Sequence, residues 1–469
     1  MEKLRTERDS IGEKQIPADA YYGVHSLRAL ENFSISGTRM HPEMIRSLAI
    51  LKKSCAIANA GARVLDREKA DAIIWACDQI AAGRFHDQFI VDPMQGGAGT
   101  SMNMNANEVI ANIAIEHLGG TLGDYSIVHP NDHVNCGQST NDVIPTAGKM
   151  TTLVLMRRLE KALAALIESL DRKADEFDCI LKMGRTQLQD AVPVRLGQEF
   201  RAYATAVQRG LKRVTHAAHE LTTINIGGTA IGTGINADSA YYLRISEILS
   251  SYVDVEFKRA YDMIDSTQNV DCFAAVSGSV RNCALALSKI ANDLRLMSSG
   301  PRTGFGEITL PARQNGSSIM PGKINPVIPE VVNQVAFRIV GNDVTISMAV
   351  EAGQMELNAF EPVIFCCLFQ SIDELAHAVE TFTKNCVDGI QANEERCVEL
   401  LESSIGIVTA LCPYLGYSKA ASLAKEALAK NISIRQMVLD EGLMSEEKLE
   451  SVLDVEGMTR PGIPGKLTV

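Results

Sequence analysis

The chain is 469 residues long, 46% of them hydrophobic, and it carries a formal net charge of -12. This length exceeds one typical domain, and the apolar content is enough to bury a large core. The acidic balance and the lack of any run rich in lysine or arginine argue against a nucleic-acid partner, which needs a basic surface. A charged amino terminus, and no apolar run of about 18 residues, indicate neither export nor a membrane span. We therefore expect a cytoplasmic protein.

Eleven cysteines are scattered singly along the chain, apart from the adjacent Cys366 and Cys367. Their odd number and the lack of a Cys-x-x-Cys pair indicate reduced thiols rather than a disulfide framework or a zinc site. No group of acidic residues has metal-ligand spacing either. We expect that no cofactor is required, while activation by a divalent cation such as Mg²⁺, at a site that sequence does not reveal, stays open.

Residues 1–141 are often interrupted by glycine and proline, which predicts a separate mixed or helical domain, with a small sheet near residues 21–37. Residues 149–183 contain neither glycine nor proline, and apolar side chains recur there at helical spacing. These side chains are Leu155, Leu159, Leu163, Leu166, Leu170 and Phe177. Such a helix would be about 50 Å long. Long helices with a continuous apolar stripe are typical of bundles.

Four later segments have the same helical pattern, namely residues 198–224, 278–299, 329–350 and 363–388. The sequence therefore predicts a central long-helix bundle domain over residues 142–397. After residue 397 the predicted helices shorten, with Ser418 and Ser433 as N-caps and Gly442 as a C-terminal stop. Residues 398–469 are accordingly expected to form a small C-terminal helical domain, in a protein that is mainly α.

One loop carries most of the chemical information. Residues 316–326 read Gly-Ser-Ser-Ile-Met-Pro-Gly-Lys-Ile-Asn-Pro, which places two hydroxyls close to a cation and an amide in a stretch that resists regular structure. Composition alone suits a surface turn. A phosphate-binding loop would need four residues between its glycine and the Gly-Lys pair, followed by Ser or Thr. Here five residues intervene and Ile324 follows the lysine, so the loop favours a different anion.

Three other segments accompany this loop in the order Gly96–Asn105, Gln138–Asp142 and Gly184–Asp190. With the loop at 316–327, they resemble the fumarase/aspartase superfamily, whose members eliminate a group from succinyl compounds to release fumarate. The likeness covers nearly the whole chain. It implies a mainly α, three-domain fold and a homotetramer in which each active site takes segments from three subunits. The substrate implied is a small dicarboxylate.

The resemblance also implies a role for each matching residue. Ser317 corresponds to the catalytic base. The β-carboxylate, which takes up the developing charge, would be held by Thr100, Ser139, Thr140 and Ser318. The α-carboxylate would be held by Lys323 and Asn325, and the amino group would be surrounded by Asn141, Thr186 and Gln187. Activation of the serine would need nearby Lys323, backbone N–H groups of the loop and exclusion of water.

Within the superfamily, the residues favour the aspartase branch, which removes ammonia from L-aspartate to give fumarate. Fumarases usually carry histidine where this chain has Gln187, and residues 189–193 and 326–330 also resemble the aspartase pattern. The second interpretation is a fumarate hydratase that interconverts fumarate and L-malate. A non-catalytic structural member is disfavoured because Ser317, Lys323 and Asn325 are all present. The group that protonates the leaving ammonia stays open.

Overall fold

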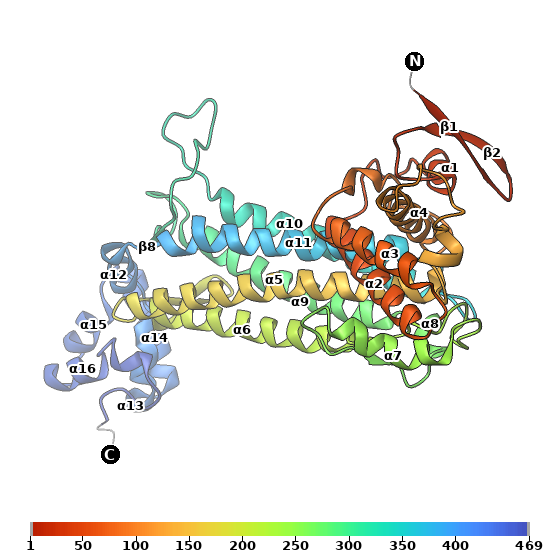
Figure 1. Ribbon diagram of the computed structural model, residues 1–469. Helices are drawn as coiled ribbons and strands as arrows, with labels where there is room; N and C mark the ends of the chain where they lie inside the picture. The colour runs from red at the N-terminus through yellow and green to blue at the C-terminus, as the bar shows by residue number, and fades with distance from the viewer. Residues whose placement is uncertain (1–2, 467–469) are drawn as a thin grey trace. The chain divides into compact units, whose positions relative to one another are not determined.

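The computed structural model describes residues 3–466 and is mainly helical (Figure 1). By contacts, the chain divides into two compact units, each assembled from three stretches of sequence. The first unit comprises Met1–Lys161, Leu211–Ala284 and Val335–Ala376, and the second comprises Ala162–Gly210, Leu285–Gln334 and His377–Val469. The division into domains 1–141, 142–397 and 398–469 therefore stays a prediction.

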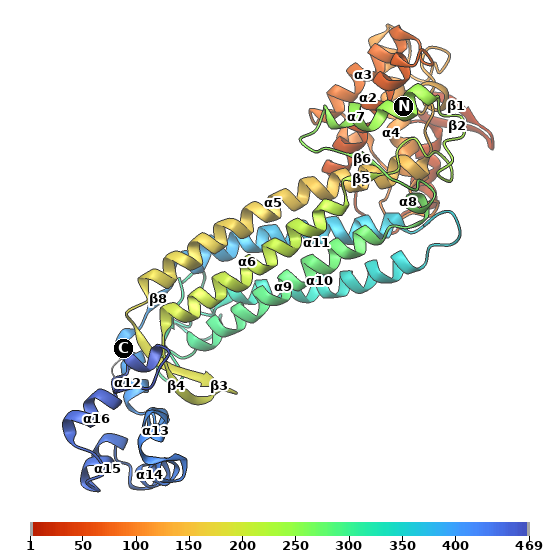
Figure 2. The same ribbon diagram turned by 90° about the horizontal axis from the view of Figure 1, so that it is seen from below.

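Five long helices contribute residues to both units (Figure 2), and each overlaps most of one segment predicted from apolar periodicity. They are α5 (Thr140–Glu176), α6 (Leu196–Glu220), α9 (Asp271–Met297), α10 (Val327–Glu351) and α11 (Glu361–Asn385). The first of them starts earlier and ends earlier than the predicted 149–183. The last three residues of the predicted helix, 181–183, instead belong to strand β3 (Leu181–Thr186).

Helix α5 contains Pro145 near its start, where proline cannot donate to the carbonyl of Asn141 four residues earlier. That carbonyl instead accepts a hydrogen bond of 3.0 Å from the Asn225 side chain, so the helix continues through the proline. Further along, Gly148 allows close packing, since a Cβ there would lie 2.2 Å from the ring of Phe365 on α11. A side chain at this position would therefore separate the two helices.

The remaining elements of the first unit are shorter than the longest helix α5. They comprise β1 (Leu4–Asp9), β2 (Gly12–Pro17), α1 (Val24–Asn32), α2 (Pro42–Gly61), α3 (Arg67–Ala81), α4 (Thr100–His117), β5 (Thr223–Ile224), α7 (Ser239–Ser250), β6 (Lys258–Arg259) and α8 (Asp265–Gln268), with single turns at His86–Gln88 and Pro130–Val134. Strands β1 and β2 form an antiparallel hairpin in which Leu4 pairs with Pro17 and Asp9 with Gly12. The predicted sheet near residues 21–37 is wrong, because helix α1 occupies that stretch.

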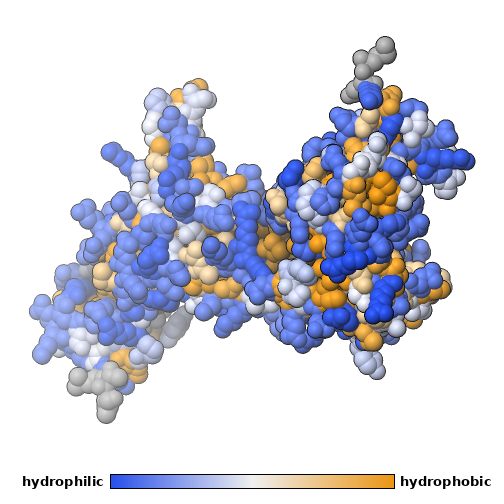
Figure 3. Space-filling model, in the orientation of Figure 1, coloured by the Kyte–Doolittle hydropathy of each residue, from blue (hydrophilic) through white to orange (hydrophobic). Residues whose placement is uncertain are grey.

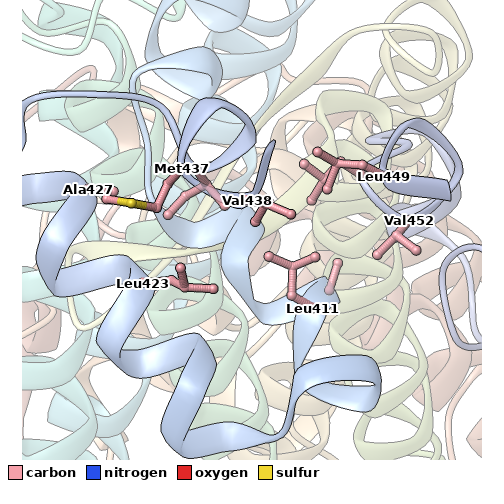
Figure 4. Packing of buried hydrophobic residues seen from close by; sticks show 10 residues of the cluster. Leu411, Leu423, Ala427, Met437, Val438, Leu449 and Val452 are labelled. Carbon is pink, nitrogen blue, oxygen red and sulfur yellow. The ribbon is translucent and has the colours of Figure 1, made fainter. Parts of the chain in front are cut away.

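The second unit contains the antiparallel hairpin of β3 with β4 (Gln189–Arg195), labelled in Figure 2, and a short pairing of β7 (Ile308–Thr309) with β8 (Gln391–Ala392). Its helices after the long ones are α12 (Glu394–Glu402), α13 (Cys412–Leu415), α14 (Tyr417–Lys430), α15 (Ile434–Asp440) and α16 (Glu446–Val452), with single turns at Val387–Gly389, Gly406–Leu411 and Gly457–Thr459. Leu411, Leu423, Met437, Val438, Leu449 and Val452 form a shared core for the last helices (Figure 4).

Two of the three predicted helix boundaries in this region are confirmed. The Ser433 hydroxyl accepts a hydrogen bond from the backbone N–H of Gln436 and caps α15. Gly442 follows that helix with φ of 64°, the left-handed conformation common after helix ends. The predicted cap at Ser418 is wrong, because α14 already begins at Tyr417 and is preceded by Gly416.

Within the described residues, one helix, extended to Glu361–Gly389, is long and apolar enough to cross a membrane by length and composition. Its most apolar window is 61% buried inside the structure, as expected for a core helix, so this is weak evidence for a span. Other apolar side chains reach the surface, where they are orange among blue polar residues (Figure 3).

Candidate active site

A left-handed turn places Thr100 at the start of helix α4. Gly97, Ala98 and Gly99 have φ of 91°, 54° and 85°. A Cβ on Gly99 would lie 2.9 Å from Ile144, so this position needs glycine for space as well as for conformation. The Thr100 hydroxyl donates to the Gly97 carbonyl at 2.7 Å. The unpaired N–H groups of a helix start favour an anion, which suits the expected role of Thr100 toward a carboxylate.

Helix α5 begins with two reciprocal side-chain caps, a variant of the capping box. The Ser139 hydroxyl accepts from the backbone N–H of Asn141 at 3.2 Å, and the Asp142 carboxylate accepts from the backbone N–H of Ser139 at 2.9 Å. Ser139, Thr140 and Asn141 are all partly buried at this helix end. The capping box fixes them where the helix dipole is positive, which again suits a carboxylate ligand.

Asp142 is buried and also holds a neighbouring loop. Its second oxygen accepts from the backbone N–H groups of Gly227 and Thr229, both at 3.0 Å. Burial raises the pKa of Asp142 to about 6, although the three backbone hydrogen bonds act in the opposite direction. These contacts give Asp142 a scaffolding role, because one carboxylate fixes both Ser139 and the loop at Gly227 and Thr229.

Asp142→Asn should destabilise the fold by about 2–4 kcal/mol. The asparagine side chain keeps one accepting oxygen, but its NH2 group replaces the other oxygen and cannot accept a hydrogen bond from a backbone N–H. Denaturant unfolding followed by circular dichroism measures this effect. Asp132→Asn, at a carboxylate that is 76% exposed, is the matched control and should change stability by less than about 0.5 kcal/mol. Equal stability of the two variants would contradict the scaffolding role.

A buried lysine lies beneath the same helix end. The Lys52 ammonium donates to the side-chain oxygens of Asn135 at 2.8 Å and Gln138 at 2.9 Å. Burial lowers the pKa of Lys52 to about 8. Asn103 of α4 donates to the same Asn135 oxygen at 3.2 Å and to the Thr140 hydroxyl at 3.4 Å. The structure thus joins the Thr100 helix to the Ser139–Asn141 segment, through Lys52 and Asn103, which sequence reasoning did not single out.

In the second unit, Thr186 and Gln187 lie at the exposed turn of the β3–β4 hairpin. Gln187 and Leu188 have φ of 54° and 63°, the pair of left-handed residues that defines a type I′ turn. Neither is glycine or asparagine, so each costs about 1–2 kcal/mol of backbone strain. The strain thus falls on one of the residues expected to bind substrate.

The loop at 316–326 is closed on itself. The Gly316 N–H donates to the Lys323 carbonyl and the Asn325 side chain donates to the Gly316 carbonyl, both at 2.7 Å. The Ser317 hydroxyl accepts from the backbone N–H groups of Ile319 at 3.2 Å and Met320 at 2.9 Å. Ser318 and Lys323 lie toward the surface. In Figure 1 this segment is the long loop that stands off the start of α10.

The backbone donors to Ser317 match one of the three activating features expected for it, because N–H groups directed at an oxygen favour its anionic form. No hydrogen bond within residues 3–466 joins Ser317 to Lys323, so the second feature is not present in this conformation. The loop is partly exposed, so exclusion of water stays an expectation too.

The expected site residues fall into two groups. The first unit holds Thr100, Ser139, Thr140 and Asn141, and the second holds Thr186, Gln187, Ser317, Ser318, Lys323 and Asn325. Between residues 3 and 466, no group of three or more His, Cys, Asp or Glu side chains is arranged to hold a metal ion. Activation by Mg²⁺ therefore has no candidate site in this part of the chain and stays a prediction.

Comparison with known proteins places this geometry in a family. The lyase family matches residues 12–341, and the C-terminal domain of fumarase C matches residues 407–460. The chain therefore belongs to this lyase family, in the fumarase/aspartase superfamily. It is a carbon–nitrogen lyase, as are relatives that share about half of its residues.

Two such relatives are the aspartate ammonia-lyases from Bacillus sp and Bacillus subtilis (strain 168). They are 52% and 51% identical, over 99% of this chain and 99% and 98% of their own lengths. Among solved structures, a fumarate lyase:delta crystallin from Brucella melitensis bound to cobalt has a TM-score of 0.95 at 49% identity, covering 98% of this chain and 100% of its own. A class II fumarase from Schistosoma mansoni has the same TM-score at 34% identity, covering 97% and 99%.

Proposed function

We propose that this chain is an aspartate ammonia-lyase that reversibly eliminates ammonia from L-aspartate to give fumarate. One observation carries the proposal: the Ser317 hydroxyl accepts hydrogen bonds from two backbone N–H groups, in a loop that also contains Lys323 and Asn325. The names of relatives about half identical over nearly the whole chain support the choice of substrate. Gln187, in place of the histidine usual in fumarases, supports ammonia rather than water as the leaving group.

The proposed reaction begins with removal of a proton from the carbon next to the β-carboxylate. This proton is barely acidic, so a base alone cannot remove it, and the electron pair must spread onto the β-carboxylate as an aci-carboxylate dianion. Stabilising this dianion is the main catalytic task. Thr100, Ser139, Thr140 and Ser318 would donate to it. The electron pair then forms the double bond of fumarate as the carbon–nitrogen bond breaks and ammonia leaves.

The other residues orient the substrate. Lys323 and Asn325 would bind the α-carboxylate, and Asn141, Thr186 and Gln187 would surround the amino group. Ser317 would act as the base once the loop has closed over the substrate and excluded water, a gating movement. The mechanism requires no cofactor, and Mg²⁺, if it activates the enzyme, acts elsewhere. We place the reaction in the cytoplasm.

We also propose a homotetramer in which the active sites are shared between subunits. The exposed side of α10 supports this, since Phe337, Val344 and Met348 are 68%, 59% and 63% exposed and recur at spacings of seven and four residues on one helix face. Such a continuous apolar face is expected to be covered by another subunit.

Complementation between inactive variants tests the sharing of sites. Thr100→Ala and Ser317→Ala proteins, each nearly inactive, should regain activity when they are mixed, dissociated and reassociated, because some sites then receive neither substitution. Mixing either variant with itself is the control. No recovery from hybrids that size-exclusion chromatography shows to have formed would place both residues of each site on one subunit.

The ultraviolet absorbance of fumarate's conjugated double bond tests the reaction itself. Purified protein should produce this absorbance from L-aspartate and not from L-malate. A rise in absorbance with L-malate alone would make the protein a fumarate hydratase and show that Gln187 was misinterpreted. No rise in absorbance with either substrate would favour another succinyl substrate or the non-catalytic alternative.

A further inference from the structure

One carboxylate in the second unit lies between two cations of the β3–β4 hairpin. The Glu307 side chain is fully buried, and it precedes strand β7. One of its oxygens is 2.7 Å from the Arg185 guanidinium, and the other is 3.2 Å from the Lys182 ammonium. Both cations belong to β3, the strand that leads into the turn with Thr186 and Gln187.

The backbone around Glu307 is fixed on both sides. Its N–H donates to the Met297 carbonyl and its carbonyl accepts from the Asn393 N–H, each at 2.9 Å. The Arg185 guanidinium also lies over the ring of Phe305, 4.2 Å from the ring centre. Arg185 is therefore held by a charge and by an aromatic face, both belonging to one anchored segment.

The hairpin that contains Arg185 is irregular on both sides of this residue. Its register shifts between Met183 and Arg185, and its turn contains the two left-handed residues Gln187 and Leu188. Such backbone strain persists only when the surrounding structure fixes it. The buried contacts of Arg185, next to the turn, are the fixation that the structure offers.

We propose that Glu307 is a positioning residue which, through Arg185, fixes Thr186 and Gln187 where the substrate's amino group binds, and so sets the preference for an amino-bearing dicarboxylate. This inference rests on the proposed ammonia-lyase function and adds to it the origin of substrate choice. Glu307 would not touch the substrate. Glu307 also lies only ten residues before Ser317 in sequence. One segment would therefore carry both the base, Ser317, and the residue that orients the β3–β4 hairpin.

Glu307→Gln tests this role, because it keeps the side chain's size and removes the charge that holds Arg185. The KM for L-aspartate should rise about 10- to 100-fold, the range for a misplaced binding group. The inhibition constant of succinate, a dicarboxylate without an amino group, should stay within about threefold of wild type. A merely structural role would weaken both ligands alike.

Asp293→Asn is the matched control. Asp293 lines the same cavity of about 270 Å³ as Glu307, but it pairs with Tyr203 and Lys289 rather than with the hairpin. This variant should leave both constants near wild type. If Glu307→Gln fails to fold, Arg185→Lys tests the same contact from the other side and should give the same split between aspartate and succinate.

An unchanged KM for L-aspartate in a folded Glu307→Gln protein, or an equal loss of affinity for aspartate and succinate, would overturn the inference. A wild-type protein that is inactive toward L-aspartate would instead overturn the proposed function on which the inference rests. The two failures are thus distinguished by the wild-type assay alone.

Discussion

Replacing Ser317 by alanine is expected to lower kcat for L-aspartate by about 10²- to 10⁴-fold, the range for loss of a general base. Substrate binding should largely survive. The Ser317 oxygen accepts from the N–H groups of Ile319 and Met320, which favour its anionic form. Alanine removes this oxygen but leaves the hydrogen bond from Gly316 to the Lys323 carbonyl, which closes the loop.

The decisive measurement is exchange of the C3 proton of L-aspartate with deuterated solvent, followed by NMR alongside steady-state turnover. Ser317→Ala should lose both. Ser318→Ala is the control from the same loop, and it should slow turnover through weaker stabilisation of the β-carboxylate while retaining measurable exchange. Near-normal turnover in Ser317→Ala would show that another group is the base.

The long helices could be predicted because their apolar periodicity is strong and uninterrupted. The start of α5 was missed because Pro145 normally ends a helix, whereas here Asn225, distant in sequence, replaces the missing donor by bonding the Asn141 carbonyl. This compensation depends on tertiary structure. Sequence periodicity near residue 145 contains no trace of it.

The amino-terminal hairpin could not be predicted, because its two strands are rich in charged residues and lack a clear alternation. Hydrogen bonds from one arginine side chain hold it instead. The Arg5 guanidinium pairs with Glu7 and donates to the carbonyls of Pro17, Ala20 and Tyr22. Two of these bonds, to Ala20 and Tyr22, hold the segment between the hairpin and α1, the helix that occupies the stretch where a sheet had been expected.

The resemblance of four segments to the fumarase/aspartase superfamily identified the residues expected to touch the substrate. It did not identify two buried charged residues, Lys52 and Glu307, that contact these segments. Lys52 precedes its partner Gln138 by 86 residues, and Glu307 follows Arg185 by 122 residues. Only the fold brings these charges together, so their sequence surroundings resemble ordinary helix and loop positions.

Lys323→Ala is expected to raise the KM for L-aspartate by about 10- to 100-fold. It should change kcat much less, because within residues 3–466 no hydrogen bond joins Lys323 to the Ser317 hydroxyl. Removing a charged hydrogen-bond partner of a ligand costs about 1.5–3 kcal/mol. The Lys323 side chain is exposed on the loop, which leaves its ammonium available to the α-carboxylate. A contact made equally in the ground state and the transition state affects KM rather than kcat.

Steady-state kinetics over a wide range of L-aspartate concentration measure this split. Lys425→Ala, at an exposed lysine of α14, is the control and should behave like wild type. The succinate inhibition constant should rise together with the KM in Lys323→Ala, since both ligands carry the carboxylate that Lys323 would bind. In Glu307→Gln only the aspartate constant should rise. A fall in kcat as large as that in Ser317→Ala would instead assign Lys323 to activation of the serine.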